Sequence, residues 1–154
     1  MGLFDFLKPV VHLDPALGPF QRARGAWRGS ISLEGAAVPL VLDGSSKAPS
    51  EAALSAAREL VARHRARRPA IERALFEHYA PHAESADAES TAPKLATPAE
   101  AGAHATLVFV ALLPLGGALT TEYGYTVAWD EEHTLGARFV GERFVELNGS
   151  VLAP

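Results

Sequence analysis

Apolar and polar positions alternate along the first third of the chain with the period of two that is typical of a half-buried strand. The alternation runs through residues 26–34 and again through 38–43, and a Gly35-Ala36 turn separates the two runs. This pattern predicts a β-hairpin. Pro39 lacks an amide donor, so we expect the second strand to lie at a sheet edge or to leave its donor side unpaired.

The clearest alternation lies between Thr121 and Leu147. Four large apolar side chains share one face of its first strand: Tyr123, Tyr125, Val127 and Trp129. The polar run Asp130–His133 interrupts the pattern, which predicts a loop there. After the pattern resumes, Gly141-Glu142 predicts a two-residue turn into a last strand.

A further strand is predicted over 104–113, the most apolar stretch of the chain, so about four antiparallel strands follow one another in the second half.

A period of 3.6 predicts a helix pair over about residues 50–80. The apolar stripe of the first helix consists of Ala53, Leu54, Ala57, Leu60 and Val61. Because proline is poorly tolerated inside a helix, we expect Pro69 to separate the two helices and Pro81 to end the second. Residues 83–97, composed largely of Ala, Ser, Glu, Thr and Pro, predict a disordered surface loop.

These elements predict a single α+β domain over residues 1–154. Its sheet is expected to be largely antiparallel with about six strands, and the helix pair is expected to pack on one face. A short apolar turn over 2–11 is expected to dock on the same domain.

The composition narrows the function classes. The 154 residues include no cysteine, which excludes thiolate zinc sites, iron–sulfur clusters, thiol catalysis and disulfides. A cytoplasmic location is therefore expected. No apolar run is long enough to span a bilayer. The chain also lacks a glycine-rich phosphate loop and a GxSxG elbow, so no cofactor is predicted.

The formal net charge is −4, and the charges are unevenly distributed. Residues 83–154 carry three basic and ten acidic groups, whereas residues 49–82 carry six basic and four acidic groups. An acidic half favours a basic partner and disfavours a phosphate backbone. Nucleic acid is therefore not the expected partner.

Asp130, Glu131, Glu132 and His133 form the best candidate site. A carboxylate beside an imidazole can form an acid–base pair or supply metal ligands. Adjacent residues of one extended loop rarely converge on a single ion, however, so a polar strand connection is the simpler interpretation.

His78 and His82 have the four-residue spacing that places two imidazoles on one helical face for zinc. Because Pro81 is expected to break the helix, no metal site is predicted. The run Arg63–Arg68 could contact phosphates, but it has no interleaved aromatic residue, so a solvated helix end is the preferred interpretation.

Two short motifs resemble a family of small bacterial domains of unknown function. One is the strand-loop-strand with Trp129, Asp130, Glu132 and His133; the other is the early hairpin with Trp27. Some members of such families resemble partners in toxin–immunity clusters. No activity can be carried over from this resemblance.

The leading hypothesis is a cytoplasmic protein that binds another macromolecule, in the manner of an immunity protein that neutralises a basic partner. The predicted contact residues are Trp129, Asp130, Glu131, Glu132 and His133. The alternative is a hydrolase-type enzyme that uses Asp130, Glu132 and His133. Homodimerisation by sheet extension through the strand 38–43 is also open.

Overall fold

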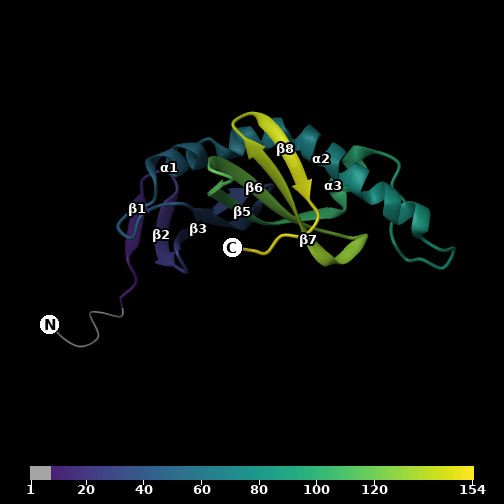
Figure 1. Cartoon of the computed structure of the whole chain (residues 1–154), viewed down its shortest axis with the longest axis horizontal. Helices are drawn as coiled ribbons and strands as arrows, with labels where there is room; N and C mark the ends of the chain where they lie inside the picture. Colours follow the sequence, from purple (N-terminus) through teal and green to yellow (C-terminus); the bar gives the residue numbers. More distant parts are fainter. Residues whose placement is uncertain (1–7) are drawn as a thin grey trace.

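One eight-stranded sheet organises the computed structural model, which describes residues 8–154 (Figure 1). The strands follow the chain in order: β1 (Val11–Asp14), β2 (Gly18–Ala23), β3 (Ala26–Leu33), β4 (Ala36–Leu42), β5 (Ala105–Leu115), β6 (Ala118–Val127), β7 (Asp130–Val140) and β8 (Arg143–Asn148). Three helices lie between β4 and β5: α1 (Glu51–Arg58), α2 (Leu60–Ser85) and α3 (Pro98–Ala103). Sequence neighbours are therefore also sheet neighbours throughout.

The sheet is mixed, because β4 and β5 pair in parallel while the other neighbouring pairs are antiparallel. A parallel pair cannot be closed by a tight turn and needs a long crossover. The segment that carries the three helices supplies this crossover. It places α1 and α2 along one face of the sheet (Figure 1).

The predicted α+β fold with a largely antiparallel sheet of about six strands is wrong. The molecule is mostly sheet, with eight strands in one mixed sheet and three helices among the described residues. The error has two sources: two strands were missed near the N-terminus, and the parallel β4–β5 pair depends on a tertiary contact that no local pattern encodes.

The two missed strands, β1 and β2, lie in a segment rich in proline and glycine, for which the alternation of polarity predicts no strand. Asp14 holds the turn between them, because its Oδ1 accepts hydrogen bonds of 2.9 Å from the amides of Ala16 and Leu17. Gly18 follows with a φ of +85°, a conformation that glycine adopts without strain. Turn chemistry therefore builds this hairpin where periodicity gives little signal.

The helix pair also differs from the prediction, since α2 runs for 26 residues through both Pro69 and Pro81. Both prolines are exposed. Water can therefore solvate the carbonyls that lose their amide donors, while the opposite face of the helix packs on the sheet. The residues of α2 that are buried against the sheet include Ile71, Leu75 and Tyr79. This packing stabilises a helix that the local sequence disfavours.

The main core lies between this helical face and the sheet. Its largest fully buried side chains are Phe20, Trp27, Leu40, Leu42, Leu60, Ile71, Leu75, Leu112, Tyr123, Leu135 and Phe139. A smaller cluster lies outside this core and contains Ala26, Val41, Phe109 and Ala111.

The strand β4 is interior, so of the two alternatives for residues 38–43 the sheet edge is wrong. Its pairing with β5 covers Leu40 to Leu42 and so begins just after Pro39. The outer strands of the described sheet are β1 and β8.

Residues 83–85 form the end of α2, and residues 86–97 connect it to α3. The hydroxyl of Tyr79 donates to the carbonyl of Pro93 at 3.1 Å and accepts from the amide of Leu95 at 3.0 Å. The single domain and the disordered loop over 83–97 stay predictions. Most of the apolar turn expected over 2–11 lies outside the described residues. Over residues 8–154, the helices do not combine the length and apolarity that crossing a membrane requires.

Candidate functional site

The five predicted contact residues lie at the turn from β6 to β7. Ala128 and Trp129 form the turn, and Asp130 to His133 are the first residues of β7. The loop predicted for Asp130–His133 is therefore strand, because the tight turn comes two residues earlier than the polar run indicates. Val127 pairs with Asp130 across the turn.

The burial of these residues divides them into two groups. Trp129 is only 7% exposed and belongs to the main core. Its ring packs edge-on against Tyr79, with centroids 5.5 Å apart. Glu131, Glu132 and His133 are exposed, while the Asp130 side chain is 11% exposed.

Asp130 and His133 contact each other directly. The Nδ1 of His133 lies 3.0 Å from Oδ1 and 2.9 Å from Oδ2 of Asp130. An ionised carboxylate only accepts, so this Nδ1 carries the proton. Glu132 contributes its backbone amide to Asp130 Oδ1 at 3.2 Å. The structure thus brings Asp130 and His133 together, and Glu132 joins them through its backbone.

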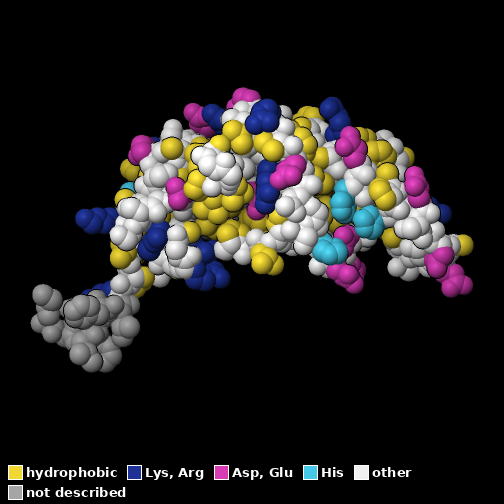
Figure 2. Space-filling view, in the orientation of Figure 1, with side chains coloured by type: hydrophobic (Ala, Val, Ile, Leu, Met, Phe, Trp, Pro, Cys, Tyr) yellow, Lys and Arg dark blue, Asp and Glu magenta, His cyan; other side chains and the backbone are white. Residues whose placement is uncertain are grey.

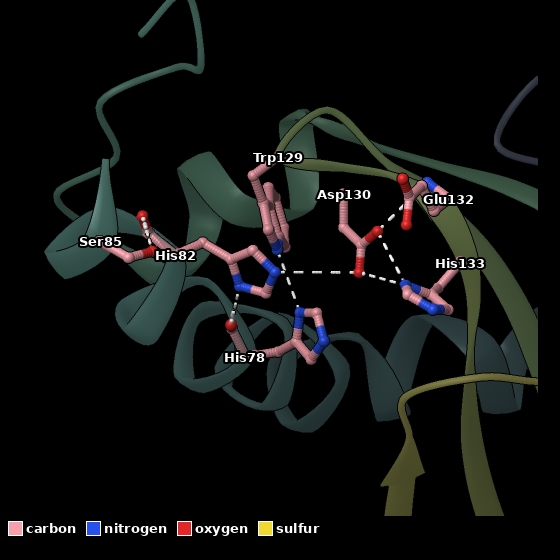
Figure 3. Close-up of polar contacts among 7 residues, drawn as sticks. All are labelled: His78, His82, Ser85, Trp129, Asp130, Glu132 and His133. Atoms are coloured by element: carbon pink, nitrogen blue, oxygen red, sulfur yellow. Dashed lines mark hydrogen bonds and ion pairs between the residues drawn. The ribbon is translucent and has the colours of Figure 1, made fainter. Parts of the chain in front are cut away.

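Two histidines of α2 converge on the same carboxylate (Figure 3). His78 and His82 lie one helical turn apart, with ring centroids separated by 4.9 Å. The Nε2 of His82 is 3.8 Å from Oδ2 of Asp130. The ligating atoms of His78, His82 and Asp130 all lie within 4.8 Å of one another. The prediction that Pro81 would misalign these histidines is wrong, because α2 continues to Ser85.

Hydrogen bonds set the orientation of both α2 rings. His82 Nδ1 lies 3.0 Å from the carbonyl oxygen of His78, so this nitrogen donates, and Nε2 carries the lone pair of the neutral ring. The indole N–H of Trp129 donates to His78 Nδ1 at 3.1 Å. Sequence reasoning identified the spacing of the two histidines. It could not identify Asp130 as their partner, because α2 and β7 are far apart in the chain.

The environment shifts the protonation of two of these groups. Burial lowers the pKa of His78, and the neighbouring His82 lowers it further. Burial acts to raise the pKa of Asp130, but hydrogen bonds from the His133 ring and from the Glu132 amide outweigh it. The pKa of Asp130 therefore lies below its ordinary value, and the carboxylate is ionised at neutral pH.

The profile of the family "Domain of unknown function (DUF6985)" matches residues 17–151. The chain belongs to this family. Searches of curated proteins and of solved structures each found no significant match. The family assignment confirms the expectation of a domain of unknown function, and its description names no activity or partner.

A cavity of about 590 Å³ in this DUF6985 domain is lined in part by His82. Tyr79, His82 and Trp129 line it on the side of α2 and the β6–β7 turn, and the connecting segment, including Asp87 and Lys94, lines it elsewhere. Acidic side chains gather with the histidines at this end of the molecule (Figure 2). We call this region the acidic end and define it by the exposed residues Glu84, Asp87, Glu89, Glu131 and Glu132.

Two arginines of the basic run Arg63–Arg68 are paired with carboxylates within the domain. Arg63 pairs with Glu59 at 2.6 Å and with Glu142 at 3.0 Å. Arg68 pairs with Glu34 and, at 2.7 Å, with Glu72. Glu59 and Glu72 are each four residues from their arginine, whereas Glu142 and Glu34 come from distant elements, so the tertiary fold builds half of this pairing. Because two of its four arginines are paired with carboxylates and Arg67 is buried, the run presents less free positive charge to phosphates than its sequence suggests.

Proposed function

We propose that the protein binds a basic protein partner through its acidic end. The observation that carries this proposal is the contrast between the two charged regions. Arg63 and Arg68 are paired with carboxylates inside the molecule. Glu131 and Glu132, in contrast, are exposed and form no ion pair among the described residues. Unpaired charge of one sign steers a partner of the opposite sign toward that surface.

The cavity at the acidic end, which Asp87 lines, supports the same proposal. Its walls include the rings of Tyr79 and Trp129, and Asp87 lies among its lining residues. A lysine or arginine has an apolar stem that packs on aromatic rings and a charged head that pairs with a carboxylate. One basic side chain of the partner would therefore anchor in this cavity, in the way that central buried contacts dominate many interfaces.

The structure changes which residues are expected to contact the partner. Trp129 is buried and can contribute only as a wall of the cavity. Asp130 is engaged by His133. The exposed contacts would be Glu131, Glu132 and His133. An immunity-type role in the cytoplasm is the specific form of this proposal, in which the basic partner is a toxin.

The test compares two charge-reversal variants that change the net charge equally. Glu131→Lys/Glu132→Lys alters the acidic end, while Glu142→Lys/Glu146→Lys alters exposed acids on the β7–β8 side that already pair with Arg63 and Arg138. Partners would be captured from native lysate with a tag that contains no histidine and identified by mass spectrometry. The affinity of each purified candidate would then be measured at several salt concentrations.

We expect a basic partner whose dissociation constant rises more than about tenfold for the first variant, a change of about 1.4 kcal/mol. The second variant should bind within a few fold of the unmodified protein. Equal binding by both variants would remove the acidic end from the interface. The molecular mass of the captured protein, measured in the same experiment, distinguishes a foreign partner from a second copy of this chain.

A hydrolase is the second candidate, and the convergence of α2 on Asp130 is the observation that favours it. The Asp130–His133 pair has the geometry of an oriented general base. His82 of α2 lies 3.8 Å from Asp130 and also lines the cavity. Hydrolysis of a panel of ester and phosphate substrates would test it. Activity that His133→Gln abolishes would support the enzyme, and activity unchanged in that variant would exclude His133 as its base.

A further inference from the structure

We propose that His78, His82 and Asp130 bind a divalent transition-metal ion of the zinc class. Their ligating atoms lie within 4.8 Å of one another, although they come from α2 and β7 (Figure 3). Zinc–nitrogen and zinc–oxygen bonds of about 2.0–2.2 Å place two ligands of a tetrahedral ion about 3.4 Å apart. Small rotations of the side chains are therefore enough to close the site.

His82 is already oriented as a ligand. Its Nδ1–H donates to the His78 carbonyl, which fixes the tautomer and directs the Nε2 lone pair outward from the helix. That nitrogen faces Asp130 Oδ2 at 3.8 Å. Two acceptors at this separation form no hydrogen bond with each other, and a cation between them would stabilise both.

Asp130 is held in place by a second set of contacts. The His133 ring donates to its carboxylate at 2.9 and 3.0 Å, and the Glu132 amide adds a bond of 3.2 Å. Such outer contacts orient a ligating carboxylate, and their removal typically lowers metal affinity by about 10–100-fold. His133 is therefore expected to be a positioning residue for the ion.

His78 must change its hydrogen bonding when the ion binds. Its Nδ1 accepts from the Trp129 indole at 3.1 Å, which places the ring proton on Nε2. Coordination through Nδ1 displaces the indole, and coordination through Nε2 moves the ring proton toward the indole. Both routes alter the surroundings of Trp129, so its fluorescence is expected to report binding.

The donor set selects the class of ion. Two imidazoles and one carboxylate suit zinc and its neighbours, whereas magnesium and calcium prefer oxygen ligands alone. Three protein ligands also leave one position of a tetrahedral ion for water or another molecule. His82 lines the cavity of about 590 Å³, so this position would lie beside a space that accepts a small ligand.

The experiment is titration calorimetry of the untagged full chain with zinc chloride, with magnesium chloride as the chemical control. We expect one zinc ion per chain and no magnesium binding. His82→Gln and Asp130→Asn should each weaken zinc binding more than about 100-fold. His104→Gln is the matched control, because His104 Nδ1 bonds the carbonyl of Glu100 at 2.9 Å in the same way but has no partner in the cluster.

Tryptophan fluorescence gives a second measurement, which reports the ion beside Trp129 and not the folding of the chain. The zinc-dependent change in tryptophan emission should persist in Trp27→Phe and disappear in Trp129→Phe. Circular dichroism would confirm that each variant folds. Zinc affinity unchanged in His82→Gln and Asp130→Asn would overturn the proposal, as would the lack of binding at micromolar zinc by the folded, unmodified chain. The variant Glu131→Lys/Glu132→Lys keeps all three ligands, so this test is independent of the partner-binding test.

Discussion

The indole N–H of Trp129 donates a hydrogen bond of 3.1 Å to Nδ1 of His78, and this bond ties the β6–β7 turn to the C-terminal half of α2. Trp129 is buried, and its ring also packs on Tyr79. Residues on either side of the bond form the candidate site: His82 follows His78 by one helical turn, and Asp130 follows Trp129 directly. The bond therefore fixes the distance between the two halves of the site.

The first prediction concerns the strength of this bond. Trp129→Phe removes the only donor of the ring, and His78→Ala removes the acceptor. A typical hydrogen bond contributes about 0.5–1.5 kcal/mol, so a double-mutant cycle in metal-free buffer should give a coupling energy of about 1 kcal/mol. Urea unfolding followed by circular dichroism measures each free energy of unfolding. Strictly additive effects would show that the bond contributes nothing to stability.

The second prediction concerns Arg67, which is only 4% exposed. Its guanidinium donates to the Tyr123 hydroxyl at 3.0 Å and to the Gly141 carbonyl at 2.6 Å, and it lies 4.8 Å from the centre of the Phe139 ring. Arg67→Ala leaves a cavity and two unpaired acceptors. We expect the free energy of unfolding to fall by about 2–5 kcal/mol.

Arg65→Ala is the matched control for this substitution, because Arg65 lies one half-turn away on the exposed side of α2. It should change the free energy of unfolding by less than about 0.5 kcal/mol. Equal effects of the two substitutions would contradict the buried role of Arg67. The comparison also shows that the run of arginines contains residues with unlike roles.

The sequence allowed six of the eight strands to be predicted, because β3 to β8 alternate in polarity or carry a long apolar run. It did not allow the β1–β2 hairpin to be predicted, since bonds from Asp14 to the turn amides replace periodicity there. The parallel pairing of β4 and β5 could also not be predicted from the sequence. That pairing depends on how a segment of about 60 residues returns to the sheet.

The candidate site was predicted in part for the same physical reason. Asp130 and His133 are three residues apart, and their contact was suggested by proximity in the chain. The four-residue spacing of His78 and His82 predicts that both rings share one helical face, but Pro81 predicts that the helix ends before His82. Local rules disfavour proline inside a helix, whereas burial of Leu75 and Tyr79 against the sheet keeps α2 intact. Tertiary packing therefore keeps α2 helical through Pro81, where the local sequence predicts a break.

The third prediction concerns Gly124, whose position on β6 faces Phe109 of the smaller cluster. A Cβ at this position would lie 2.1 Å from Cε1 of Phe109, whose ring is only 2% exposed and cannot move freely. Gly124→Ala should therefore lower the free energy of unfolding by about 1–3 kcal/mol. Gly149→Ala is the control, because its Cβ would meet no atom closer than 4.0 Å. A Gly124→Ala variant as stable as the control would show that the Phe109 ring moves to make room for the added Cβ.

The last prediction concerns stability in acid and rests on Asp14. The Arg58 guanidinium, 2.6 Å from Oδ2, holds the pKa of Asp14 at about 2, below the ordinary value of 3.8, and the amides of Leu17 and Ala16 contribute to the same shift. Because the folded pKa is the lower one, ionised Asp14 stabilises the fold above the unfolded value. That stabilisation is lost as the pH falls from about 3.8 to about 2.

Asp14→Asn keeps an oxygen for the two turn amides and removes the titration. The difference in the free energy of unfolding between the unmodified protein and Asp14→Asn should therefore be constant above about pH 5 and shrink steadily below pH 3.8. Arg58→Met removes the main cause of the pKa shift of Asp14. It should therefore weaken the dependence of the free energy of unfolding on pH below 3.8. Denaturant unfolding at a series of pH values measures both. A difference that stayed constant down to pH 2 would show that Asp14 titrates at its ordinary pKa in the folded protein, and the Arg58 contact would then be too weak to hold the β1–β2 turn against α1.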